Sequence, residues 1–154
     1  MAETSKSLRQ VLLGTVPSLV VTRAALDGAD GLVLDADLLD AAGFLEHEKV
    51  DLLDVTNGAR LAAPVTAAPR ASGEVAVSGA VAQLVRPGDL VTLSSFGWMK
   101  EKQAKKHQPQ RVVTDAQNRA VGAAAPADAA AAVKPPSPKR AKKKQKAGRS
   151  PAAG

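Results

Sequence analysis

The side chains best suited to chemistry are few in this chain of 154 residues. It has no cysteine, which excludes disulfides, thiolate metal sites and thiol nucleophiles. The two imidazoles, His47 and His107, are too few for a multi-histidine site, so we expect no metal, and His47 fits a solvated position near a helix end. Arg60 is singled out by its place, because it closes a run of residues that predicts a helix, a strand and a hairpin turn.

The residues before Arg60 predict the elements that must position it. Asp35 or Asp37 can cap a short helix with an apolar face of leucines and alanines, and Gly43 suits the left-handed residue that closes such a helix. A strand-like run at 50–53 follows. Asn57-Gly58, just before the arginine, is the strongest short-range signal for a tight hairpin turn.

Short strands separated by turns rich in glycine and proline make up most of the remaining pattern. Residues 75–78 alternate as a half-buried strand does, Gly79 to Leu84 could form one helical turn, and residues 86–89 have Pro and Gly where a type II turn needs them. Pro64 marks its segment as an edge strand or an irregular piece. The expected strands cover residues 8–14, 16–22, 32–34, 50–53, 61–68, 75–78 and 90–96. This pattern indicates a mainly β fold built as a small barrel.

Residues 8–97 resemble the pyruvoyl-dependent aspartate 1-decarboxylases, with the matching residues in the same order and nearly without gaps. The matching residues are Val21-Thr22, Asp35, Asp40-Ala41-Ala42-Gly43, Leu45-Glu46, Glu48, Val55-Thr56-Asn57-Gly58, Arg60, Val77, Gly79-Ala80, Gly88-Asp89 and Ser95-Phe96. The resemblance implies a small double-psi β-barrel with short helices. It also implies an enzyme that makes β-alanine for pantothenate biosynthesis, assembled as a homotetramer with its active sites between subunits.

Members of that family generate their own cofactor by cleaving a Gly-Ser bond, which leaves an N-terminal pyruvoyl group. The reaction requires a hydroxyl or thiol nucleophile at that position. The resemblance places Asp30-Gly31 there, and no Ser, Thr or Cys occurs between Arg23 and Val55. The pyruvoyl cofactor is therefore not expected to form. Asp30-Gly31 could in principle isomerise, although a plain flexible turn explains it better.

Other positions that the resemblance makes important differ as well. The family's lysine, histidine, threonine, tyrosine and asparagine fall at Thr15, Pro17, Ala63, Pro64 and Ser78. The retained positions are Arg60, which would grip a substrate carboxylate, and Gly79 and Ala80, whose backbone N–H groups would line the pocket beside Ser78. Arg60 could equally be a surface or interface arginine.

Charge and composition divide the chain. Residues 1–99, the expected barrel, hold 7 basic and 12 acidic residues, whereas residues 100–154 hold 14 basic and 3 acidic ones, within a net charge of +6. We expect residues 100–119 to pack on the barrel and residues 120–154 to form a disordered Ala/Pro/Lys-rich tail. The tail could bind polyanions without sequence preference, or only keep the protein dissolved.

No apolar run is long enough to span a membrane, and the polar N-terminus does not resemble a signal peptide, so a cytoplasmic location is expected. We favour a decarboxylase homologue that does not self-process and acts as a binding or assembly subunit, with a small carboxylic acid at Arg60. It would be a homo-oligomer or would co-assemble with an active paralogue. The alternatives are an enzyme with redirected, pyruvoyl-independent chemistry on an amino-acid-like substrate, and an active aspartate 1-decarboxylase.

Overall fold

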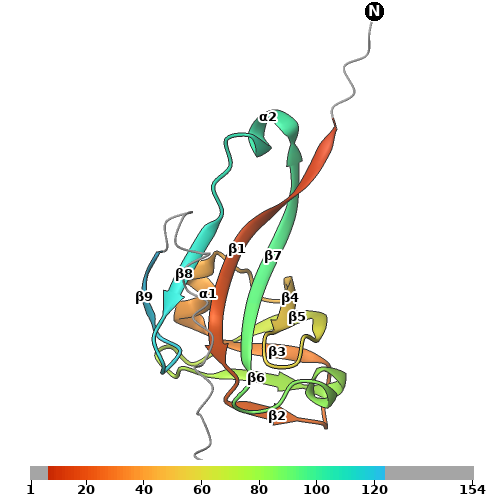
Figure 1. The fold of residues 1–154 in the computed structure, drawn as a ribbon, viewed down its shortest axis with the longest axis vertical. Helices are drawn as coiled ribbons and strands as arrows, with labels where there is room; N and C mark the ends of the chain where they lie inside the picture. The colour runs from red at the N-terminus through yellow and green to blue at the C-terminus, as the bar shows by residue number, and fades with distance from the viewer. Residues whose placement is uncertain (1–6, 124–154) are drawn as a thin grey trace, which may run out of the picture.

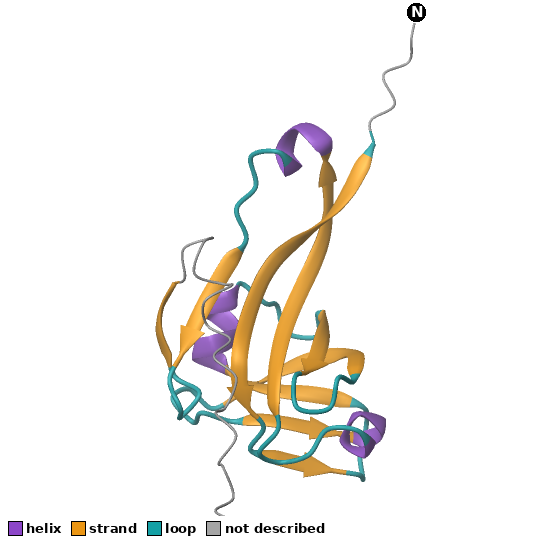
Figure 2. Ribbon diagram, viewed as in Figure 1, coloured by secondary structure: helices purple, strands orange, loops and turns teal. Residues whose placement is uncertain are grey.

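The computed structural model describes residues 7–123. Its elements are β1 (Leu8–Val20), β2 (Arg23–Ala25), β3 (Gly31–Asp35), α1 (Ala36–Ala42), β4 (Lys49–Asp54), β5 (Arg60–Ala68), β6 (Val75–Ser78), the 3₁₀ turn η1 (Gly79–Gln83), β7 (Leu90–Lys100), α2 (Glu101–Ala104), β8 (Gln110–Thr114) and β9 (Ala120–Ala123). The nine strands pair in the order β2-β6-β3-β5-β4-β7-β1-β8-β9 (Figure 1). Strands dominate and the helices are short (Figure 2), which confirms the mainly β fold predicted from the sequence.

The sheet mixes parallel and antiparallel pairs, and strands distant in sequence are neighbours. β1 pairs antiparallel with β7 and parallel with β8, while β3 pairs parallel with β5 and antiparallel with β6. β1 and β7 form a long ribbon that extends past the other strands and ends at α2 (Figure 1). Hairpins join only β4 to β5 and β8 to β9 among the described strands, so the rest of the sheet depends on long-range pairing.

The core lies where the sheet wraps around its aliphatic side chains. It is built from valine and leucine, with Phe44 as its only aromatic residue. Helix α1 closes one side, and Gly14 of β1 passes so close that a Cβ there would overlap the carbonyl oxygen of Ala42. The largest fully buried side chains are Leu19, Leu34, Leu38, Leu52, Leu93, Val16, Val21, Val50, Val65, Val77, Val85 and Val91.

Asp35, one of the two caps that the sequence offers, begins helix α1, and Gly43 ends it in the predicted left-handed conformation at φ +70°. The Asp35 carboxylate is 1% exposed. Its Oδ1 accepts from the N–H groups of Asp37 (2.9 Å) and Ala71 (3.2 Å), and its Oδ2 accepts from the N–H of Gly73 (2.8 Å). One carboxylate thus fixes both the start of α1 and the loop between β5 and β6.

Three strand predictions are wrong in detail. Residues 8–22 do not form two strands, because β1 continues past Pro17 through register shifts at Leu12/Gly14 and Val16/Leu19. β5 is interior, since Pro64 falls where its pairing with β4 ends and its pairing with β3 begins. β6 is not half-buried, because Ala76 is buried like Val75 and Val77 beside it.

The turns follow the sequence more closely. Asp89 N–H donates to the Arg86 carbonyl (3.1 Å) and Gly88 has φ +90°, as a type II turn at residues 86–89 requires. The hairpin after β4 does contain Asn57-Gly58, but the loop is longer than a two-residue turn. It runs through residues 55–59 because the Asp54 carboxylate accepts from the N–H groups at its start.

The segment after β7 packs on the rest of the fold through β8 and through Asn118. This asparagine is 2% exposed; its Nδ2 donates to the carbonyls of Val20 (2.8 Å) and Gly73 (3.0 Å), and its Oδ1 accepts from Val20 N–H (2.8 Å). The disordered tail predicted from residue 120 begins too early, because Ala120–Ala123 form β9 against β8. Residues 124–154 lie outside the described part.

Replacing Asn118 tests this attachment. Asn118→Ala leaves the Val20 and Gly73 backbone groups without partners, so we expect it to lower the free energy of unfolding by about 2 kcal/mol or more. Urea denaturation followed by circular dichroism measures the change. Gln117→Ala, at the exposed neighbouring position, is the control and should unfold like the wild type. Equal stability of the two variants would show that Asn118 is not a structural tie.

Candidate functional site

The expected cleavage position lies where the loop after β2 enters β3. Gly31, the first residue of β3, pairs with Ser78, the last residue of β6. Ser78 Oγ donates to the carbonyl of Ala29 at 2.7 Å. The loop residues on one side and the end of β6 on the other are thus joined directly at this junction.

The backbone conformation at position 31 does not require glycine. Its φ is not in the left-handed region, and a Cβ built there would approach only the Pro64 carbonyl oxygen (3.6 Å) and Ser78 Oγ (3.8 Å). Both are ordinary van der Waals distances, so a serine would fit. The residue at this position is therefore free of steric constraint, and its identity matters for chemistry more than for folding.

Position 79, in contrast, does require glycine. It has φ +69°, and a Cβ there would overlap Asp30, lying 2.9 Å from that residue's Cα and N. The close approach lets Asp30 Oδ1 accept a short hydrogen bond from the N–H of Ala80. The Ala80 N–H, which the resemblance assigns to the pocket lining, is therefore already hydrogen-bonded to the Asp30 side chain.

Arg60 lies elsewhere on the chain. As the first residue of β5 it pairs with Leu53, and it lines a groove of about 580 Å³ on the sheet face formed by β5, β4, β7 and β1. Within the described residues it forms no ion pair. The remaining lining residues are Leu12, Asp51, Leu52, Leu53, Leu61, Ala62, Thr92, Ser94 and Phe96.

The predicted site residues therefore form two groups within one chain. Asp30, Gly31, Ser78, Gly79 and Ala80 converge at the junction. Pro64 is the β5 residue that lies beside Gly31. Arg60 is four residues before Pro64 in the same strand, and four residues of a strand span about 13 Å. One copy of the chain does not bring the arginine to the junction.

The base of the Arg60 groove carries hydroxyl groups and no lysine or histidine. Thr15 is buried; its Oγ1 lies 2.9 Å from Ser94 Oγ and donates to the Leu93 carbonyl at 3.2 Å. Hydroxyls held in this way are neutral at physiological pH. Arg60 and Asp51 are the charged side chains that line the groove.

Sequence reasoning missed Asp51 as a groove residue and treated it only as a polar strand position. Its cross-strand partner is Ala62, two residues after Arg60, so side-chain alternation puts Asp51 and Arg60 on the same sheet face. The signal was available once β4 and β5 were paired in the observed register. The five-residue loop made that register hard to foresee.

Asp54 supports the loop that leads to Arg60. It is 2% exposed, and its Oδ1 accepts from Thr56 N–H (2.8 Å) and Asn57 N–H (3.3 Å), while Oδ2 has no hydrogen-bond partner among the described residues. Burial raises the pKa of the Asp54 carboxyl above its usual range, and the neighbouring Asp89 carboxyl acts in the same direction. The loop is therefore held by a carboxyl group whose ionisation is energetically unfavourable.

Among the described residues, no three His, Asp or Glu side chains are grouped to hold a metal ion. No helix in the part of the chain that the structure describes is long and apolar enough to cross a membrane.

The mixed sheet, the capped helix α1 and the β2–β3 junction define a small β protein of the architecture that the sequence resemblance implies. The aspartate decarboxylase family model matches residues 7–121. The chain belongs to the aspartate decarboxylase family.

Replacing Asp54 by asparagine keeps the Oδ1 acceptor and removes the buried charge. Because the folded-state pKa is raised, folded Asp54 holds its proton to higher pH than the unfolded chain, and stability falls as pH rises through that interval. We expect Asp54→Asn to be more stable than wild type at pH 7 by about 1 kcal/mol, with the difference shrinking towards pH 4. Urea midpoints measured at several pH values test this.

The exposed Asp27→Asn is the matched control, because it removes one carboxylate from the surface. A pH dependence of Asp54→Asn that matches Asp27→Asn would contradict the role of burial at Asp54.

Proposed function

We propose that this chain is an aspartate decarboxylase homologue that does not convert itself to the pyruvoyl form and serves as a binding or assembly subunit. The observation that carries the proposal is Gly31 at the family's cleavage position. The pyruvoyl group would form from a serine at that position, whose Oγ attacks the preceding carbonyl and whose Cβ becomes the methyl carbon, and glycine has neither atom. The residues present do not fit the cofactor.

The surroundings of Gly31 support this reading. The neighbouring hydroxyl, Ser78 Oγ, already donates its hydrogen to the Ala29 carbonyl. Asp30 Oδ1 holds the N–H of Ala80. The loop between β2 and β3 is thus tied at two adjacent residues to the end of β6 and the start of η1, and the Ser78 hydroxyl is engaged with the Ala29 carbonyl instead of the Asp30–Gly31 bond.

A retained carboxylate site is the second part of the proposal. Arg60 lies in an open groove with no ion-pair partner among the described residues, beside the hydroxyls of Thr92 and Ser94. A small carboxylic acid could accept a bidentate pair from the guanidinium there. The proton-donating tyrosine expected from the resemblance is replaced by Pro64, so binding without turnover is the function that these side chains favour.

An assembly role accords with the exposed apolar surface. Two of the three aromatic residues of the chain lie on one face of β7, where Phe96 is 44% and Trp98 is 66% exposed. Exposed aromatic side chains are typical of protein interfaces. We therefore propose self-association, or association with an active paralogue, through the surface that includes this face.

Intact mass spectrometry tests the absence of self-processing. The purified protein should give one chain near 15.7 kDa and should form no β-alanine from L-aspartate, because position 31 offers no nucleophile. Two chains that separate between Asp30 and Gly31, or β-alanine produced by the purified chain alone, would overturn the proposal.

Matched variants isolate the cause. Asp30→Gly should stay uncut, since it still lacks a hydroxyl. The double change Asp30→Gly with Gly31→Ser restores a Gly-Ser pair and releases the Ala80 N–H, so slow cleavage at that bond is expected, more than for Gly31→Ser alone. Even the cleaved double variant should form no β-alanine, because Pro64 supplies no proton.

Thermal shift measurements test the carboxylate site. Succinate and L-aspartate at millimolar concentration should raise the melting temperature of the wild type by about 2 °C or more, as a ligand that binds only the folded state does. Arg60→Ala should abolish the shift. Arg86→Ala removes another exposed arginine, outside the groove, and should leave the shift unchanged. If neither acid shifts the wild type, the groove is not a carboxylate site and only the assembly role remains.

A further inference from the structure

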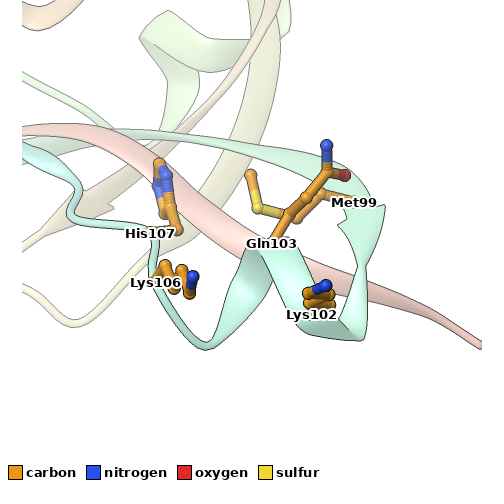
Figure 3. A pocket seen from close by; sticks show the side chains of 5 residues that line it. All are labelled: Met99, Lys102, Gln103, Lys106 and His107. Atoms are coloured by element: carbon orange, nitrogen blue, oxygen red, sulfur yellow. The ribbon is translucent and has the colours of Figure 1, made fainter.

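A second pocket lies at the far end of the β1–β7 ribbon, away from both groups of predicted site residues. It has a volume of about 570 Å³ and is lined by Met99, Lys102, Gln103, Lys106 and His107. In Figure 3, Lys102 and Gln103 project from α2, Lys106 and His107 follow in the turn after it, and Met99 lies between the two sides. Nothing in the family's aspartate chemistry uses this region.

The arrangement of charges leaves this pocket positive. Glu101, the carboxylate of this turn, is engaged by Lys105 Nζ (3.2 Å), Arg9 (3.6 Å) and the Ser7 hydroxyl (3.1 Å). Those contacts lower the pKa of Glu101, the Lys105 contact contributing most. Within the described residues Lys102 and Lys106 form no ion pair, so the ammonium groups of these two lining residues remain available to a ligand.

His107 is held in a fixed orientation. Its Nε2 lies 2.8 Å from the Leu12 carbonyl oxygen, and because a carbonyl only accepts, Nε2 carries the hydrogen. The contact ties the turn after α2 to the edge of β1 and leaves Nδ1 as the ring's other polar atom. The pocket wall is therefore built on the sheet and is not a free surface loop.

The rest of the pocket lining is apolar, and the pocket is large. The Met99 side chain and the methylene stems of Lys102 and Lys106 supply an apolar surface, and a thioether packs well against aromatic rings. A volume of this size falls in the range of small-molecule sites, about 300–1,000 Å³, and exceeds what a lone inorganic anion would fill. A suitable ligand joins an anionic group to a flat apolar one.

We propose that this pocket binds a phosphorylated small molecule of nucleotide size. Its phosphate pairs with Lys102 and Lys106, because ammonium groups act as point charges towards phosphate oxygens. The ring packs on Met99, and Gln103 can donate to or accept from its polar edge. The proposal is independent of the function assigned to Arg60.

Trp98, the one tryptophan of the chain, precedes Met99 but lies on the opposite face of β7, so its fluorescence is an indirect readout of binding. The full-length protein is titrated with AMP and ATP, and with adenosine and inorganic phosphate as partial ligands. We expect a saturable change with the nucleotides and at least about tenfold weaker binding of either partial ligand. Isothermal titration calorimetry gives the dissociation constants independently.

Charge-matched variants test the site itself. Lys102→Ala with Lys106→Ala should weaken nucleotide binding at least about tenfold, equivalent to losing the two pairing charges. Lys100→Ala removes an exposed lysine just before α2 that does not line the pocket, and it should change the dissociation constant less than about twofold. Arg60→Ala should not change it. All three lysine sites are exposed, so the variants should fold.

Four results would overturn the proposal. No response to any nucleotide would show that the pocket is empty of function. A loss of affinity with Lys100→Ala as large as the loss per lysine in the double variant would indicate diffuse charge instead of a site. Equal affinity for inorganic phosphate would exclude a nucleotide-sized ligand. Binding of a single-stranded oligonucleotide without binding of AMP would assign the surface to nucleic acid.

Discussion

The buried carboxylate of Asp35 is the constraint on which the arrangement of this fold depends. It accepts from three backbone N–H groups in two segments, and so it fixes the start of α1 and the loop before β6 together. Asn118 then binds the same loop at the Gly73 carbonyl and joins it to the end of β1. Buried polar groups of this kind are costly when a partner is lost, which makes them strong determinants of a single arrangement.

The junction follows from that constraint. Asp35 ends β3, the strand that Gly31 begins, so fixing one end of a five-residue strand fixes the other. The two glycines at the junction then differ in kind. Gly79 is imposed by its backbone angle and by the contact with Asp30, whereas nothing in the packing imposes Gly31. The packing around position 31 therefore leaves room for a Cβ that glycine does not have.

Local signals predicted the local structure well. The Asp35 cap, the Gly43 terminus and the turn at residues 86–89 each depend on a few adjacent residues, and the sequence contains them all. Pairing between distant strands was not predictable. Pro17 suggested a break in β1, but β7 pairs with residues on both sides of it, and no local pattern encodes that pairing.

The candidate site shows the same division. Residue identity was enough to propose a binding role for Arg60 and the lack of a nucleophile at position 31, because each proposal depends on the residue at one position. The separation of Arg60 from Gly31, the place of Asp51 on the arginine's face, and the use of the Ala80 N–H by Asp30 depend on register and on loop closure. Register and loop closure depend on pairing between residues far apart in the sequence, and composition and local spacing do not predict that pairing.

The pairing of β1 has a consequence for biosynthesis. Its partners are β7 and β8, which lie at residues 90–100 and 110–114, so β1 is synthesised well before the strands that satisfy its edges. Closing so long a loop is slow, and an unsatisfied strand edge invites pairing with other chains. Until translation has passed β8, β1 is therefore a segment at which nascent chains can associate with one another.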